Sequence, residues 1–159
     1  MLSDIRVLTT ALDPTAEQAS LWLGNPGIGA LVSFIGLMRD QNEDSQVSRL
    51  TLEHYPGMTE KALAAIAAEA AQRWPVEAIR ILHRVGDLEP QDPIVLVAVA
   101  AAHRGDAFRC CEFLIDYLKI RAPFWKKETR AQGSRWVIAR AADLQAASRW
   151  NMATADPPA

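Results

Sequence analysis

The sequence contains little cysteine or histidine. It has two cysteines, which are adjacent at positions 110 and 111, and three histidines scattered along 159 residues. Neighbouring cysteines do not easily adopt disulfide geometry, and this arrangement of His and Cys matches no usual metal-ligand spacing. We therefore expect a chain without a structural crosslink and without a bound metal, kept in a reducing environment.

An excess of charge of one sign and long hydrophobic runs are also missing. Seventeen Lys and Arg oppose nineteen Asp and Glu, for a formal charge of −2. Non-specific nucleic-acid binding needs a broad basic surface, which this balance does not supply. The longest apolar stretch, residues 93–102, is too short to span a bilayer, and the first residues lack the pattern of a signal peptide. These absences predict a cytoplasmic protein that binds neither nucleic acid nor membrane, in which any anion site is local.

The composition favours a folded α+β protein. Half of the residues are hydrophobic and 23% are charged, which suffices to bury a core. Apolar and alternating stretches predict strands over residues 5–10, 30–38, 48–55, 77–85, 93–102, 124–130 and 134–140. A polar loop at 39–46 lies between the second and third of these strands. Helical spacing and breakers predict helices over residues 14–23, 59–74, 106–122 and 141–150. We expect mixed sheets flanked by helices, with one domain over residues 1–150 and a flexible tail over 151–159.

The second of these helices has the clearest pattern. Thr59 is the expected N-cap and Pro75 the expected stop. One face carries apolar side chains at helical spacing, namely Leu63, Ile66, Ala67, Ala70 and Trp74. We expect this face to be buried against the rest of the fold.

One candidate anion site follows the apolar strand that ends at Ala102. His103 and Arg104 come directly before a helix, whose N-terminus presents free N–H groups and the positive end of its dipole. Arg can bind a phosphate through two hydrogen bonds. The pair is equally typical of a polar, exposed strand end, so the residues alone leave both interpretations open.

A second candidate site lies in the stretch YLKIRAPFWKKE, residues 117–128. Lys119 follows Cys111 and Ile115 on one helix face, so we expect it at the edge of a packed surface. Lysines in a last helical turn commonly just complement the dipole. Lys126 follows large aromatics, and nearby cations with partial desolvation would lower its pKa into a range useful for proton transfer. A solvated charged face explains the same run equally well.

The remaining reactive residues give weaker signals. Arg39 and Arg140 each close a predicted strand, a position that permits convergence without requiring it. We expect His83 to be structural and the two cysteines to be inert in helix packing. No glycine-rich phosphate loop or dinucleotide fingerprint occurs. The residues alone thus indicate an α+β protein with a candidate anion pocket.

Several separated motifs occur in an order that resembles the family of the large, catalytic subunit of molybdopterin synthase. They are FIGLMR, LTLEHYPGMTEKAL, HRVGDL, AHRGDAF, DYLKIRAPFWKKE and RWVIAR, within residues 28–150. The resemblance implies an α/β hammerhead-type fold with an additional antiparallel β region. It also implies a sulfurtransferase of molybdenum cofactor biosynthesis that needs no cofactor of its own.

The same resemblance implies particular partners and a particular reaction. The large subunit forms a homodimer, and each copy binds one small ubiquitin-like sulfur carrier to give a heterotetramer. The carrier's C-terminal Gly-Gly thiocarboxylate enters the pocket. Two sulfurs then pass to cyclic pyranopterin monophosphate to form the dithiolene of molybdopterin.

The family's site residues transfer one by one to this sequence. The resemblance implies that Lys119 and Lys126 are catalytic and that Phe34 lines the channel for the carrier tail. It implies substrate contacts from Leu37, Met38, Arg39, His103, Arg104, Lys127, Glu128 and Arg140. Gln91 and Ala101 depart from the family pattern, the first where glycine is usual, which puts local geometry in doubt. The alternatives are a non-catalytic carrier-binding module and, more distantly, a phosphate-ester enzyme.

Overall fold

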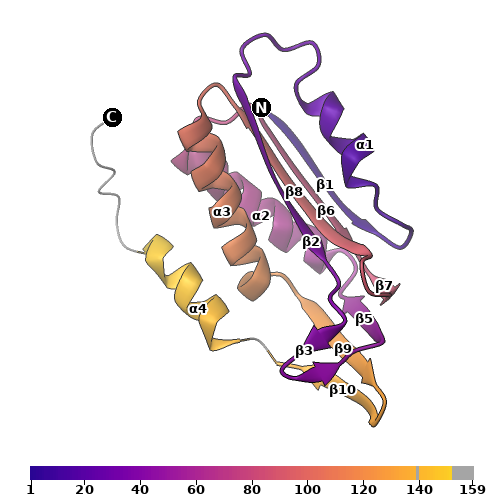
Figure 1. Cartoon of the computed structure of the whole chain (residues 1–159). Helices are drawn as coiled ribbons and strands as arrows, with labels where there is room; N and C mark the ends of the chain where they lie inside the picture. Colours follow the sequence, from indigo (N-terminus) through magenta and orange to yellow (C-terminus); the bar gives the residue numbers. More distant parts are fainter. Residues whose placement is uncertain (139, 152–159) are drawn as a thin grey trace.

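A four-stranded mixed sheet forms the centre of the structure, a computed structural model that describes residues 1–138 and 140–151 (Figure 1). Its strands, in spatial order, are β1 (Leu2–Leu8), β6 (Ala78–Arg84), β8 (Pro93–Ala101) and β2 (Ala30–Leu37). β1 runs parallel to β6, and the other neighbours are antiparallel. β2 is therefore an edge strand in this chain, with one side not paired within the sheet.

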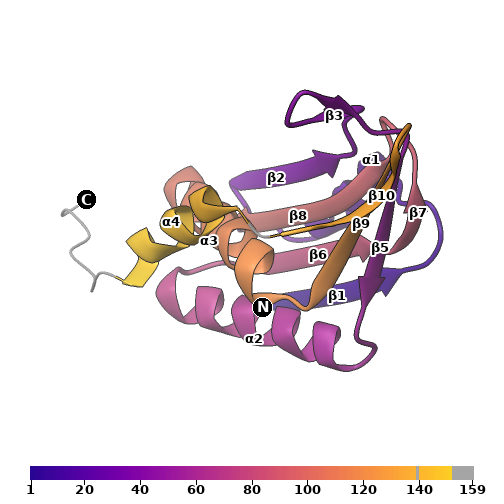
Figure 2. The ribbon, with the colours of Figure 1, turned by 90° about the horizontal axis from the view of Figure 1, so that it is seen from below.

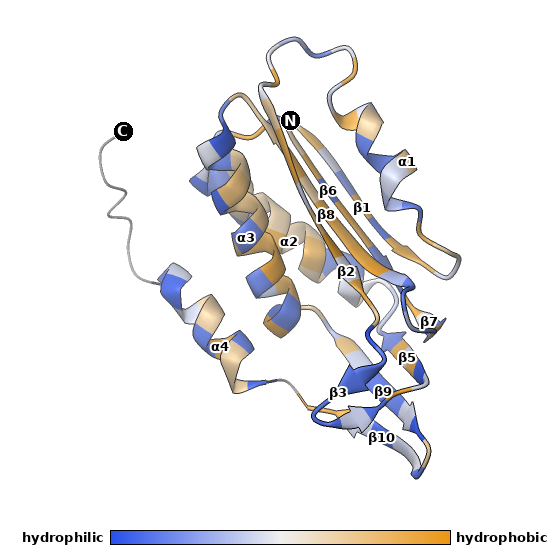
Figure 3. Cartoon of the chain, in the orientation of Figure 1, coloured by the Kyte–Doolittle hydropathy of each residue, from blue (hydrophilic) through white to orange (hydrophobic). Residues whose placement is uncertain are grey.

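Helices cover both faces of this sheet (Figures 1 and 2). α2 (Met58–Arg73) and α3 (Arg104–Arg121) pack on one face, and α1 (Pro14–Gln18) with the 3-10 turn Ala19–Leu21 packs on the other. β6 and β8 are consequently buried on both faces, which is why β8 is a continuous apolar run rather than an alternating one (Figure 3). β6 is equally buried but also carries the polar side chains of Arg80 and His83. The predicted mixed sheet flanked by helices is confirmed.

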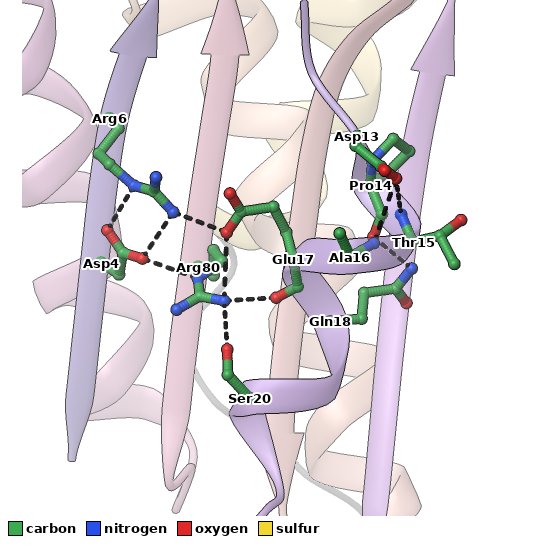
Figure 4. Close-up of polar contacts among 10 residues, drawn as sticks. All are labelled: Asp4, Arg6, Asp13, Pro14, Thr15, Ala16, Glu17, Gln18, Ser20 and Arg80. Atoms are coloured by element: carbon green, nitrogen blue, oxygen red, sulfur yellow. Dashed lines mark hydrogen bonds and ion pairs between the residues drawn. The ribbon is translucent and has the colours of Figure 1, made fainter.

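A buried arginine ties the short helix α1 to the sheet (Figure 4). Arg80 Nε donates to Asp4 Oδ2 at 2.7 Å, and Arg80 Nη1 donates to Ser20 Oγ at 2.9 Å and to the carbonyl of Glu17. Arg6 joins Asp4 to the Glu17 carboxylate. Because the Arg80 side chain is only 10% exposed, its charge is tolerated there through these partners.

A second, antiparallel sheet lies beyond one end of the first. Its strands in spatial order are β10 (Gly133–Val137), β9 (Phe124–Arg130), β5 (Arg49–His54) and β7 (Gly86–Leu88). The loop expected at 39–46 contains a small hairpin of β3 (Gln41–Asn42) and β4 (Ser45–Gln46), turned by residues with positive φ at Glu43 and Asp44. The chain then ends in α4 (Ala141–Ser148) and the 3-10 turn Arg149–Asn151.

The start of α2 differs from the prediction. The helix begins at Met58, and the N-cap is Gly57, whose N–H donates to the Glu60 carboxylate at 2.7 Å. Thr59 lies inside the first turn, fully buried, and its hydroxyl accepts from the N–H of Tyr55. The predicted cap at Thr59 is therefore wrong, because glycine supplies the positive φ of 82° needed before the helix. The expected apolar face is buried, and the helix ends before Pro75.

The other expected boundaries shift only slightly. The helix predicted over 14–23 ends at Leu21, and the segment expected as a turn after β6 contains β7. The strand predicted over 134–140 ends at Val137. Asn151 belongs to the last 3-10 turn and accepts from the hydroxyl of Tyr117 at 3.0 Å, so the predicted tail does not begin there. Residues 139 and 152–159 lie outside the described residues.

Gln91 adopts the backbone conformation of a glycine. Its φ is 77°, and its N–H donates to the carbonyl of Met38, while Met38 donates to the carbonyl of Asp92. The turn thus fixes the end of β2. The left-handed backbone conformation of Gln91 in this turn is unfavourable for any residue with a side chain.

We expect Gln91→Gly to raise the free energy of unfolding by about 1 kcal/mol, measured by urea denaturation. Glu89→Gly in the same turn is the matched control, because Glu89 has no such backbone conformation and its replacement should destabilise. A Gln91→Gly protein no more stable than the parent would contradict the assignment of strain.

Candidate anion-binding site

Two lysines from different elements meet beside the end of α3. Lys119 lies in the last turn of α3, after buried Cys111 and half-buried Ile115 on the same face, so its predicted position at the edge of a packed surface is confirmed. Lys126 lies in β9, close enough for the Lys119 charge to act on it. Asp143 of α4 faces them, with its Oδ1 at 3.8 Å from Lys119 Nζ.

The environment of Lys126 lowers its pKa. Desolvation by the surrounding protein is the main cause, and the charge of Lys119 is the next. Arg140 adds to the effect, whereas Asp143 and Glu128 oppose it. Lys126 therefore releases its proton more readily than an ordinary lysine, as the sequence predicted. A cationic Lys119 beside a lysine of lowered pKa can bind an anion and exchange a proton with it.

Glu128 holds the neighbouring polar groups in place. Its side chain is buried, accepts from Asn42 Nδ2 at 2.5 Å and from Arg130 Nη2 at 2.7 Å. Arg140 in turn donates to Asn42 Oδ1. The Glu128 carboxylate thus satisfies internal donors in this chain, and its predicted substrate contact stays a prediction. Asn42 was not predicted, and only its place in the polar loop hinted at a role.

Lys127 lies on the opposite face of β9 from Lys126. Side chains alternate along a strand, and Lys127 Nζ lies over the Trp136 ring at 5.6 Å from its centroid. It does not join Lys126, although the two are neighbours in sequence. Lys127 therefore faces away from the lysine pair in this chain, and its predicted substrate contact stays a prediction.

The residues at the end of β2 differ in their exposure to solvent. Leu37 and Arg39 are exposed, but Met38 is 4% exposed and packs in the core of the second sheet. The Met38 side chain therefore faces the core in this chain, and its predicted substrate contact stays a prediction. Leu37 and Arg39 remain accessible.

A groove of about 480 Å³ between β2 and α3 contains Phe34. Its lining is Val32, Ser33, Phe34, Phe108, Cys111, Glu112, Ile115 and Asp116. Lys119 is one helical turn beyond Ile115 on the same face. The groove thus leads along α3 towards the lysine pair, which agrees with a channel for an extended chain.

His103 and Arg104 lie at the other end of α3. With Gly29, Ala102 and Gly105 they line a separate hollow of about 500 Å³. Since each helical residue adds about 1.5 Å, Arg104 and Lys119 are roughly 22 Å apart along the axis of α3 (Figure 1). His103 and Arg104 therefore do not join Lys119 and Lys126 within a single chain.

The two cysteines are structural, as expected. Both are buried in α3, and burial raises the pKa of each thiol to about 12. A thiol of this kind is a poor nucleophile near neutral pH. Among the described residues, no group of three His, Cys, Asp or Glu side chains is placed to hold a metal ion, and no described helix is long and apolar enough to cross a membrane.

His83 packs behind the lysines. It is 4% exposed, stacks on Phe124 with ring centroids 3.8 Å apart, and its Nδ1 lies 2.9 Å from the carbonyl of Arg84. Burial is the main cause that lowers its pKa to about 4; the hydrogen bond with the carbonyl of Arg84 opposes this shift, and the charges of Lys126 and His54 add to it. His83 is thus a neutral structural residue, as the sequence indicated.

Acid should destabilise the fold through His83. The unfolded chain takes up a proton near pH 6.5, and the folded chain does so only near pH 4, so stability falls as the pH drops through this window. We expect a loss of about 3 kcal/mol from His83. Urea denaturation of His83→Phe should show a correspondingly flatter pH dependence, whereas His103→Gln, at an exposed histidine, should not. An unchanged slope in His83→Phe would contradict the prediction.

Fold and site together define a class: α+β proteins in which two lysines lie beyond one end of a groove between a sheet edge and a helix. Comparisons with known proteins narrow this class. The model of the family described as "MoaE protein" matches residues 7–121. The chain is 58% identical over 150 residues to the molybdopterin synthase catalytic subunit of Ralstonia nicotianae, covering 94% of this chain and 85% of that one. The chain belongs to the MoaE family.

Solved structures share the fold. The molybdopterin biosynthesis MoaE protein of Burkholderia ambifaria superimposes with a TM-score of 0.81 at 55% identity, covering 95% of this chain and 99% of that one. A chain of the complex of subunits 1 and 2 of molybdopterin-converting factor from Helicobacter pylori has a TM-score of 0.69 at 22% identity, covering 86% and 91%. The fold predicted from the sequence is thereby confirmed.

Proposed function

We propose that this chain is the catalytic subunit of a molybdopterin synthase. It transfers two sulfurs from the C-terminal thiocarboxylate of a small carrier to cyclic pyranopterin monophosphate, forming the dithiolene. The observation that carries the proposal is the pairing of Lys119 with Lys126 at the end of the Phe34 groove, in a chain of the MoaE family. The groove accommodates an extended tail, and the lysines meet its anionic end.

Each lysine has a distinct task in this proposal. Lys119, paired with Asp143, attracts the thiocarboxylate and the phosphate. Lys126, with its lowered pKa, exchanges protons as sulfur adds and the cyclic phosphate opens. Arg39 and Arg140 add positive charge on nearby elements. Preorganised charge and positioning supply most of the rate, without a metal or an organic cofactor.

Two copies of the chain would complete the site. The exposed edge of β2 carries apolar side chains at Phe34, Ile35 and Leu37, and exposed apolar edges favour association. In a twofold dimer that packs two β2 edges antiparallel, the ends of the strand exchange places. The partner subunit's His103 and Arg104 then lie towards the Arg39 end of the first copy, because β2 begins beside the end of β8.

The assembly follows from these surfaces. Each copy of the homodimer binds one small ubiquitin-like carrier, giving a heterotetramer. Residues 1–150 act as one domain, and the protein works in the cytoplasm. The balanced charge of the chain and its short apolar stretches support an enzyme of small molecules rather than of nucleic acid or membrane.

Reconstitution tests the proposal directly. The purified chain, thiocarboxylated carrier and cyclic pyranopterin monophosphate should together yield molybdopterin, detected by reconstitution of a molybdoenzyme. A non-catalytic binding module would capture the carrier tail without converting the precursor. That result would refute the catalytic proposal while leaving the carrier interface intact.

A further inference from the structure

Asp143 faces the lysine pair from the first turn of α4. Its Oδ1 lies 3.8 Å from Lys119 Nζ, with side-chain exposures of 26% and 45%. The N–H of Asp143 donates to the carbonyl of Arg140 at 3.0 Å, which fixes this turn. An acidic residue here also stabilises the helix N-terminus, which is the ordinary role of such a residue. The tertiary setting indicates a second role.

Both ends of α4 are fastened so that Asp143 stays over the lysines. Before the helix, Arg140 donates to Asn42, which is held by buried Glu128. After it, Trp150 packs edge-on against the ring of Phe113, with centroids 5.6 Å apart, and its Nε1 donates to Asp116 at 2.7 Å. If Asp143 only stabilised the N-terminus of α4, the helix would not need to be held over the lysines.

Charged groups from several elements face Lys126. They are Lys119 from α3, Arg140 and Asp143 from the start of α4, Glu128 from β9 itself and His83 from β6. His83 is neutral above pH 4, and Glu128 is engaged by Asn42 and Arg130. Asp143 is therefore the acidic group that balances the lysine pair directly.

We propose that Asp143 is a positioning residue of the sulfur-transfer site, which holds Lys119 in place beside Lys126 so that Lys126 performs the proton transfer. This inference rests on the proposed function. An incoming anion competes with Asp143 for Lys119, so the carboxylate weakens ground-state binding and sustains turnover. Its removal should therefore change binding and rate in opposite directions.

Asp143→Asn tests this in the full chain with thiocarboxylated carrier and cyclic pyranopterin monophosphate. We expect the precursor concentration for half-maximal single-turnover rate to fall about two- to fivefold, the range of a partly exposed ion pair. The maximal rate should decrease. The limb of the pH–rate profile that follows Lys126 should move to lower pH, because loss of a nearby negative charge favours the neutral lysine.

Two further variants separate positioning from structure. Asp143→Glu keeps the charge and should restore most of the maximal rate and the pH profile. Asp87→Asn removes the same charge from β7, where Asp87 lies 3.6 Å from Arg49, and should change none of the three quantities. A wild-type pH profile and wild-type binding in Asp143→Asn, even with a lower melting temperature, would overturn the proposal. Failure of the proposed function would appear separately, as no product from the unaltered chain.

Discussion

Replacing Lys119 with alanine should nearly abolish molybdopterin formation while leaving the fold intact. Lys119 is the cation at the end of the groove, and it also shapes the acidity of Lys126. Loss of one preorganised electrostatic contact typically costs about 10²–10³ in rate, and we expect at least the lower figure in a single-turnover assay. The side chain is 45% exposed and pairs only loosely with Asp143, so thermal unfolding should change little.

Matched substitutions identify what the lysine supplies. Lys61→Ala removes an exposed lysine from α2, far from the groove, and should leave the rate unchanged. Lys119→Arg keeps a permanent cation and should retain part of the activity. Lys126→Arg should not, because guanidinium does not release a proton in this pH range. Substantial activity in Lys119→Ala would show that the groove ends at a different catalytic group.

Two inactive variants should restore activity when they share a dimer. Arg104 and Lys119 are too far apart to serve one site within a chain. In the proposed dimer, each site therefore takes Arg104 from one copy and Lys119 from the other. Arg104→Ala and Lys119→Ala should each be severely impaired alone. When they are refolded or co-expressed together, each mixed dimer has one intact site. Random mixing should then recover about a quarter of the parental activity.

A second mixture of variants serves as the control for this experiment. Mixing Lys119→Ala with a chain that carries both substitutions leaves no intact site and should give no recovery. Tagged copies purified in tandem show that mixed dimers have formed. If mixed dimers form and remain inactive, His103 and Arg104 do not complete the site of the partner copy, and the hollow around them serves another purpose.

Local pattern in the sequence determined most of the architecture. The apolar face of α2 and the continuous apolar run of β8 were visible in the sequence, because such patterns depend only on neighbours in the chain. The edge position of Lys119 and the lowered pKa of Lys126 also followed from nearby residues. The length of α3 was equally visible in the sequence, and it would have shown that Arg104 and Lys119 cannot meet in one chain.

Only the tertiary structure decided which polar groups share a site. The contacts of Asn42 with Glu128 and Arg140, and of Asp143 with Lys119, join segments far apart in the chain. Such contacts depend on how elements pack across long loops, which no local period encodes. The sequence by itself therefore determined the helices, the strands and the two lysines. The packing determined which polar groups lie around them, namely the carboxylate of Asp143 and the amide of Asn42.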